Sequence, residues 1–250
     1  MRKPADLEGL DGIVLPGGES TAMGLIGTTG GTNLWDALRE FSQTKPTWGT
    51  CAGMILLAEK CVGASAVIQD GQSLIGGVDV LVCRNYFGSQ ISSFEMPTPA
   101  PPGDGNDTFF PGVFIRAPAL LSAGPGVEVL GKVVAIPCRQ AAVVLQELEQ
   151  KISRGEDVVM MGVVDALDRK EGEGIFYKDV KSDQSGEEKK EFRSKTRIEL
   201  PGAADGSNAR EVICAVRKEY VLCTAFHPEL TRDYRWHAYF SNMVREFNRP

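Results

Sequence analysis

The sequence predicts an α/β fold, a three-layer structure in which helices flank a mostly parallel sheet. One pattern in the sequence carries this prediction. Short apolar runs that end in glycine or proline alternate along the chain with segments of helical periodicity. Strands that alternate with helices are typical of a parallel sheet covered on both faces. The 250 residues suit one large domain, or one domain with insertions.

The clearest element signals lie in the first quarter of the chain. We predict strands at residues 10–16 and 45–49 and helices at 33–43 and 52–60. The first strand ends in Pro-Gly-Gly, which indicates a tight loop. In the first helix, Leu34, Leu38 and Phe41 recur at helical spacing, and Asn33 is the expected N-cap.

The remaining apolar runs predict further β structure and one terminal helix. The runs that read as strands or as mixed apolar segments are 74–83, 112–116, 126–137, 141–148 and 220–226. We predict a final helix at 231–248 with Thr231 as its cap. Its apolar face is formed by Trp236, Tyr239, Phe240, Met243 and Phe247.

Two stretches do not fit this core. Residues 97–107 (PTPAPPGDGND) are rich in proline and glycine and predict a loop. Residues 168–208 contain a dense run of charge, and we expect them to form a surface insertion in a single domain of residues 1–250. A solvated loop is a better interpretation of this insertion than a functional element.

The composition excludes several classes of protein. The net charge of −6 and the pI of about 5.1 argue against a nucleic-acid surface. No apolar run approaches the ~20 residues of a membrane helix, and residues 1–12 lack the apolar centre of a signal peptide. We therefore expect a cytoplasmic protein with reduced cysteines. The six cysteines form no CxxC pair and the chain has only two histidines, so no metal site is expected.

Cys51 lies in the sequence WGTCAG, between a predicted strand and a predicted helix. The pattern Gly-x-Cys-x-Gly at such a junction is the thiol version of the nucleophile elbow. Glycines on both sides remove Cβ atoms that would clash with the neighbouring strand. The helix N-terminus is expected to favour the thiolate and to offer N–H groups to an oxyanion. A buried structural cysteine in a tight turn is about equally compatible with this motif alone.

A histidine and a carboxylate late in the chain complete a possible triad. The segment AFHPEL follows the last predicted strand directly, and Pro228 biases His227 towards extended backbone. Residues i and i+2 of an extended segment point to the same side, so Glu229 can orient the His227 imidazole. The alternative is a surface histidine beside a helix-terminal glutamate. His237 falls within the aromatic final helix, and we assign it to packing.

A third motif, LPGGEST at 15–21, ends the first predicted strand. Gly17 and Gly18 leave the backbone exposed, so that an N–H can turn towards an oxyanion or a substrate carboxylate. The motif is neither a phosphate-binding P-loop nor a dinucleotide fingerprint, because the required Gly-Lys-Ser/Thr and G-x-G-x-x-G patterns are absent. By itself it is equally compatible with a tight turn and a helix cap.

The three motifs together, in this order, resemble the triad (class I) glutamine amidotransferases. Two further stretches, RNYFGSQ at 84–90 and GVFIRAP at 112–118, resemble the glutaminase subunits of pyridoxal 5′-phosphate synthase within that family. The resemblance covers residues 2–135 and 211–247. It implies a three-layer α/β domain that hydrolyses L-glutamine to L-glutamate and ammonia without a cofactor. It also implies a partner, the (β/α)₈-barrel oligomer of the synthase subunit, which receives the ammonia for vitamin B6 biosynthesis.

The resemblance also implies roles for individual residues. Cys51 would be the nucleophile, His227 the general base and acid, and Glu229 the orienting carboxylate. The backbone N–H groups of Gly18 and Ala52 would hold the oxyanion. The glutamine-contacting residues would be Gly17, Gly18, Glu19, Ser20, Arg84, Ile115 and Arg116. Arginine suits the α-carboxylate of glutamine, although an ion pair at a strand end is the simpler interpretation of Arg84 and Arg116 taken alone.

The chain also departs from the family pattern. It begins after the strand, Gln-Gly loop and helix with which the family normally opens, so we expect either a truncated gene model or a product impaired in stability and activity. Ser89 stands where many relatives carry arginine. Two alternative functions therefore stay open: a catalytically impaired subunit that still binds the synthase, and a cysteine hydrolase of related fold.

Overall fold

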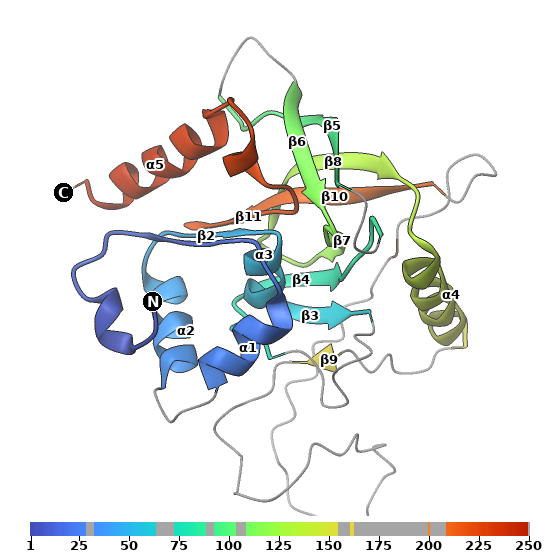
Figure 1. The fold of residues 1–250 in the computed structure, drawn as a ribbon, viewed down its shortest axis with the longest axis horizontal. Helices are drawn as coiled ribbons and strands as arrows, with labels where there is room; N and C mark the ends of the chain where they lie inside the picture. The colour runs from blue at the N-terminus through green and yellow to red at the C-terminus, as the bar shows by residue number, and fades with distance from the viewer. Residues whose placement is uncertain are drawn as a thin grey trace, which may run out of the picture.

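The computed structural model describes residues 1–28, 33–63, 73–88, 93–103, 109–154, 161–162, 200 and 209–249. The charged insertion expected at 168–208 lies outside the described residues except for Leu200, and Ser89 lies outside them as well. The described residues form an α/β structure, as predicted (Figure 1).

The main sheet follows the order β1-β2-β11-β10-β7-β4-β3-β9, and β8 also pairs with β10. Its strands are β1 (Ile13–Leu15), β2 (Thr47–Thr50), β3 (Ala58–Val62), β4 (Val78–Cys83), β7 (Ala119–Ala123), β8 (Glu128–Ala135), β9 (Met161–Gly162), β10 (Arg210–Lys218) and β11 (Val221–Thr224). A separate hairpin pairs β5 (Ser93–Pro99) with β6 (Phe109–Ile115).

The main sheet is mixed, whereas the sequence predicted a mostly parallel one. Strands β1, β2 and β11 pair in parallel, as do β3 and β4. The other pairs are antiparallel. The physical reason is clearest at β10 and β11, which a tight turn at Glu219 and Tyr220 joins into a hairpin. Strands joined by so short a connection can only be antiparallel.

Five α-helices accompany the sheet in the described residues: α1 (Ser20–Thr28), α2 (Leu34–Thr44), α3 (Ala52–Leu57), α4 (Arg139–Ser153) and α5 (Arg235–Phe247). In Figure 1, α5 lies on one side of β2 and β11, and α1 to α3 lie on the other. Trp48 of β2 contacts Phe240 of α5 with ring centroids 5.6 Å apart. The region of β1, β2 and β11 therefore has the three-layer arrangement that the sequence predicts.

Several predicted boundaries are wrong. The helix predicted at 52–60 ends at Leu57, because residues 58–62 instead pair with β4 as strand β3. The apolar run at 141–148 belongs to helix α4. Periodicity in so short a run does not distinguish a helix from a strand. The proline-rich stretch from 97 begins inside β5, where Pro97 and Pro99 lie on a hairpin strand.

Neither predicted helix cap makes a side-chain capping hydrogen bond to its helix, although Asn33 does stand at the N-cap position of α2. Asn33 precedes α2 in the left-handed region, with φ of 50°, and its side chain makes no capping hydrogen bond. Thr231 lies before the turn that leads into α5, which begins only at Arg235. The Thr231 hydroxyl accepts a hydrogen bond from the Asp233 N–H at 3.2 Å and so stabilises that turn.

The apolar face predicted for the final helix is confirmed in its centre. Trp236, Phe240 and Met243 are buried against the sheet, and Trp236 contacts the rings of Phe110 and Phe226. His237 packs edge-on against Trp48, as the sequence predicts for this histidine. None of the described helices is both long enough and apolar enough to span a bilayer.

Candidate active site

Cys51 occupies a strained turn between β2 and α3. Its φ of 48° and ψ of −103° lie outside the regions that L-residues ordinarily adopt. The turn is held by hydrogen bonds: the Cys51 N–H donates to the Thr224 carbonyl at 2.8 Å, and the Cys51 carbonyl accepts from the Ile55 N–H at 3.2 Å. Strain of this kind persists where the surrounding structure fixes it and is concentrated at functional sites.

The two glycines that flank Cys51 allow the strand and the helix to approach closely. A Cβ atom on Gly53 would lie 2.0 Å from the carbonyl oxygen of Leu15 in β1. A Cβ atom on Gly49 would lie 2.6 Å from the carbonyl carbon of Gly53. The predicted reason for the Gly-x-Cys-x-Gly pattern is therefore correct for Gly53 and the neighbouring strand. For Gly49 the obstacle is helix α3.

His227 and Glu229 meet as the sequence predicts. His227 Nδ1 lies 2.7 Å from Glu229 Oε1. The His227 side chain is largely buried, whereas nearly half of the Glu229 side chain is exposed. Pro228 opens the 3-10 helix η3 (Pro228–Leu230). The buried Nε2 atom of His227 has no hydrogen-bond partner among the described residues.

Gly17 packs directly against the His227 ring. A Cβ atom on Gly17 would lie 2.3 Å from His227 Cε1. Gly17 does not line the pocket that holds Cys51. Its contact with the imidazole differs from the substrate contact that the family resemblance implies for this residue.

Burial raises the pKa of the Cys51 thiol to about 11, and the Glu229 carboxylate contributes to the rise. The backbone N–H groups of Ala52 and Gly18 are directed at the sulfur and act in the opposite direction, as does the charge of Arg116. The sequence-based expectation of a lowered thiol pKa is therefore wrong, because burial outweighs the N–H groups of the short helix α3. The two N–H groups nevertheless come from the two residues predicted to hold an oxyanion.

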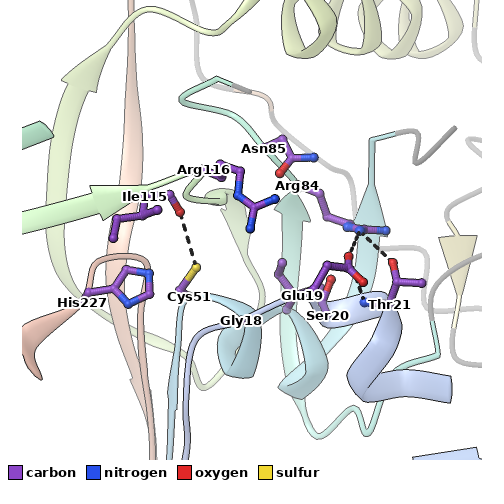
Figure 2. Close-up of a pocket in the computed structure, with 11 residues that line it drawn as sticks. Gly18, Glu19, Ser20, Thr21, Cys51, Arg84, Asn85, Ile115, Arg116 and His227 are labelled. Atoms are coloured by element: carbon purple, nitrogen blue, oxygen red, sulfur yellow. Dashed lines mark hydrogen bonds and ion pairs between the residues drawn. The ribbon is translucent and has the colours of Figure 1, made fainter. Parts of the chain in front are cut away.

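A pocket of about 460 Å³ brings most of the predicted residues together (Figure 2). The predicted residues that line it are Gly18, Glu19, Ser20, Cys51, Arg84, Ile115, Arg116 and His227. The Ile115 carbonyl lies 3.9 Å from Cys51 Sγ and accepts its weak hydrogen bond. Glu229 contacts the His227 imidazole and does not itself line the pocket.

Arg84 extends from the end of β4 to the far side of the pocket from His227 (Figure 2). Its Nη2 atom donates to the Thr21 hydroxyl at 3.1 Å and lies 3.7 Å from Glu19 Oε1. Glu19 also caps the N-terminus of helix α1, because its Oε2 atom accepts a hydrogen bond from the Ala22 N–H at 2.8 Å. Burial opposes ionisation of Glu19, but the N–H groups of Ala22 and Thr21 outweigh it and lower the pKa of this carboxyl.

Sequence reasoning missed three residues of the pocket wall: Thr21, Ile55 and Asn85. Thr21 directly follows Ser20 and Asn85 directly follows Arg84, so their positions beside predicted site residues were an available signal. Nothing in the sequence distinguishes Ile55 from other apolar residues of α3. The described residues contain no group of three histidine, cysteine or acidic side chains that could hold a metal ion.

Comparisons with known proteins place the chain in a family. The family model described as "SNO glutamine amidotransferase family" matches residues 1–152, more than half of the chain. The chain belongs to the SNO glutamine amidotransferase family. The resemblance that the sequence motifs indicate is thereby confirmed.

Individual SNO-family relatives support the assignment. The "Probable pyridoxal 5'-phosphate synthase subunit PDX2" of Arabidopsis thaliana is 36% identical over 250 residues, which cover 98% of this chain and 76% of the plant protein. The "Pyridoxal 5'-phosphate synthase subunit PdxT" of Deinococcus radiodurans is 46% identical over 131 residues, 52% of this chain and 64% of the bacterial protein. A solved structure described as "Crystal structure of glutamine amidotransferase" has a TM-score of 0.58 and 27% identity, and covers 98% of this chain and 85% of its own. The fold predicted for this SNO-family chain is thus confirmed.

Proposed function

We propose that this amidotransferase hydrolyses L-glutamine to L-glutamate and ammonia through Cys51, His227 and Glu229, and delivers the ammonia to a synthase that makes pyridoxal 5′-phosphate. One observation carries the proposal. A cysteine on a strained turn shares a pocket with a histidine whose Nδ1 atom lies 2.7 Å from a carboxylate. That arrangement is the geometry of a nucleophile, a base and an orienting acid.

The first half-reaction forms a thioester. The Cys51 thiol, with a pKa of about 11, is protonated at neutral pH, so His227 Nε2 takes the proton as the sulfur attacks the side-chain carbonyl carbon of glutamine. The N–H groups of Gly18 and Ala52 stabilise the oxyanion. His227 then gives its proton to the departing nitrogen and the C–N bond breaks. Ammonia departs, and the γ-glutamyl group stays on Cys51 as a thioester.

The second half-reaction regenerates the enzyme. His227 takes a proton from a water molecule, whose oxygen attacks the thioester carbon. The C–S bond breaks, Cys51 recovers a proton from His227, and L-glutamate leaves. Glu229 stabilises the imidazolium in both halves, because its Oε1 atom lies against Nδ1. Arg84 and Arg116, which line the same pocket, bind the α-carboxylate of glutamine.

The relatives support the identity of the partner. The plant and bacterial proteins at 36% and 46% identity are named as subunits of pyridoxal 5'-phosphate synthase. We infer that this chain binds the (β/α)₈-barrel synthase oligomer and passes ammonia to it. Six free thiols support a cytoplasmic location for the complex.

The direct test is ammonia release from L-glutamine by the full chain mixed with the synthase. The wild-type chain is expected to release ammonia and glutamate in equal amounts. Cys51→Ala is expected to lower the rate by about 10⁴-fold or more, because it removes the nucleophile. Equal rates for the two proteins would overturn the proposed mechanism. An absence of turnover by the wild-type chain with the synthase would favour a binding subunit without catalytic activity.

A further inference from the structure

Thr21 presents a buried hydroxyl to the side of the pocket that lies away from Cys51. It is the second residue of helix α1, and only 9% of its surface is exposed. A buried hydroxyl needs a hydrogen-bond partner, since leaving it without one costs free energy. Arg84 Nη2 donates a hydrogen bond to Thr21 Oγ1 at 3.1 Å, and the Thr21 side chain also hydrogen-bonds Glu19, where it helps to lower the pKa of that carboxyl.

The Arg84 guanidinium depends on this contact more than on its acidic neighbour. Only 7% of Arg84 is exposed, so its charge needs nearby polar groups. The carboxylate of Glu19 is 3.7 Å from Nη2, beyond hydrogen-bond distance. Half of the Glu19 side chain is exposed. Its oxygens accept hydrogen bonds from the backbone N–H groups of Thr21 and Ala22, in the first turn of α1. The Thr21 hydroxyl, which accepts a hydrogen bond where Glu19 does not, therefore fixes the direction of the guanidinium.

We propose that Thr21 is a positioning residue, which holds the Arg84 guanidinium in the orientation that receives the α-carboxylate of L-glutamine. This inference rests on the proposed glutaminase function. Arginine loses considerable rotamer entropy when it is held in one geometry. The backbone fixes only the base of the side chain, because the Arg84 N–H donates to the Val62 carbonyl of β3 at 2.9 Å. The Thr21 hydroxyl, fixed on α1, orders the other end before the substrate arrives.

Thr21→Val tests the inference, because valine keeps the shape of threonine and removes the hydroxyl. With the full chain bound to the synthase, KM for L-glutamine is expected to rise about tenfold, which corresponds to about 1.4 kcal/mol. The kcat value is expected to stay within about twofold, since Thr21 does not contact the reacting atoms. Thr21→Ser, which keeps the hydroxyl, is expected to restore the wild-type KM. Thr21→Ala is measured in parallel, because alanine removes the same hydroxyl and favours the helix.

A substrate without the α-carboxylate separates positioning from general damage to the pocket. L-glutamine α-amide carries a neutral carboxamide in place of that carboxylate, so the wild-type enzyme is expected to prefer L-glutamine. The preference is expected to fall about tenfold in Thr21→Val, because only the charged substrate uses Arg84. Thr98→Val is the matched control. Thr98 is also buried and its hydroxyl donates to the Phe110 carbonyl at 3.0 Å, outside the pocket.

The outcomes are distinguishable. A raised KM for L-glutamine alone, restored by Thr21→Ser, supports the inference. An unchanged KM in both Thr21→Val and Thr21→Ala, or an equal loss for both substrates, overturns it. If the wild-type complex itself fails to release ammonia from L-glutamine, the proposed function fails and not merely the role of Thr21.

Discussion

At the scale of single residues, the environment of Cys51 sets how the thiol is activated. Burial and the Glu229 charge hold its pKa at about 11, so the isolated protein contains little thiolate at neutral pH. The N–H groups of Gly18 and Ala52 point at the sulfur but do not reverse the shift. Under the proposed mechanism, activation therefore comes from proton transfer to His227 during the attack rather than from a thiolate formed in advance.

The pH dependence of alkylation tests this description of Cys51. Below its pKa, each pH unit raises the thiolate fraction about tenfold, and the thiolate is the nucleophile. Iodoacetamide labelling of Cys51, followed by peptide mass spectrometry on the isolated chain, is expected to rise about tenfold per unit from pH 7 to pH 9. A labelling rate that is constant across this range would show that the thiol is already ionised and would contradict the raised pKa.

Substitution of Gly17 should displace the His227 imidazole, because Gly17 packs against the ring and does not line the pocket. Its φ lies outside the left-handed region, so alanine adopts the backbone freely, but the new Cβ would lie 2.3 Å from His227 Cε1. Displacement of a catalytic group by about 1 Å can cost about 100-fold in rate. Gly17→Ala is expected to lower kcat by about that factor with a smaller change in KM, as measured by steady-state ammonia release. A kcat within threefold of the wild type would show that the ring tolerates the contact.

At the scale of elements, helix α5 closes the core on one side of the sheet. Trp236 is fully buried against Phe110 and Phe226. Trp236→Ala is expected to lower the free energy of unfolding in urea by about 3–5 kcal/mol. Glu246→Ala, on the exposed side of the same helix, is expected to change it by less than about 0.5 kcal/mol. A similar change for the two variants would contradict the assigned packing of α5.

The sequence predicts best those elements whose signal is local. The Gly-x-Cys-x-Gly turn, the AFHPEL segment and the apolar face of α5 all follow from neighbouring residues. Strand β10 was missed because its partners β7, β8 and β11 are set by contacts across the chain. The sequence predicts residues 58–60 as the end of the helix at 52–60, because only the pairing of residues 58–62 with β4 shows that they form a strand.

The same distinction applies to the candidate site. Cys51, His227 and Glu229 could be brought together as one candidate site because their motifs, taken together, resemble one family, although each motif alone leaves a structural alternative. The hydrogen bond between Thr21 and Arg84 could not be predicted, because the two residues are 63 positions apart in the sequence. The raised pKa of Cys51 was missed for a related reason. Helix position is visible in the sequence, whereas the burial that outweighs it arises only in the folded chain.

At the scale of the whole molecule, the order of strands explains why distant motifs meet. Strands β1, β2 and β11 are neighbours and run parallel, so their carboxyl ends lie at one edge of the sheet. Gly17 follows the first of these strands, Cys51 the second and His227 the third. Ligands bind at the carboxyl ends of such strands in open α/β sheets. The fold thus brings the beginning and the end of the chain to one pocket.

The most direct test of the account asks whether Cys51 carries the substrate. The full chain is mixed with the synthase and L-glutamine, quenched in acid during turnover, digested and analysed by mass spectrometry. The account predicts a γ-glutamyl adduct on the peptide that contains Cys51, and no adduct when L-glutamate replaces L-glutamine. Ammonia release by a complex whose adduct lies on another residue, or that turns over Cys51→Ala at the wild-type rate, would contradict it.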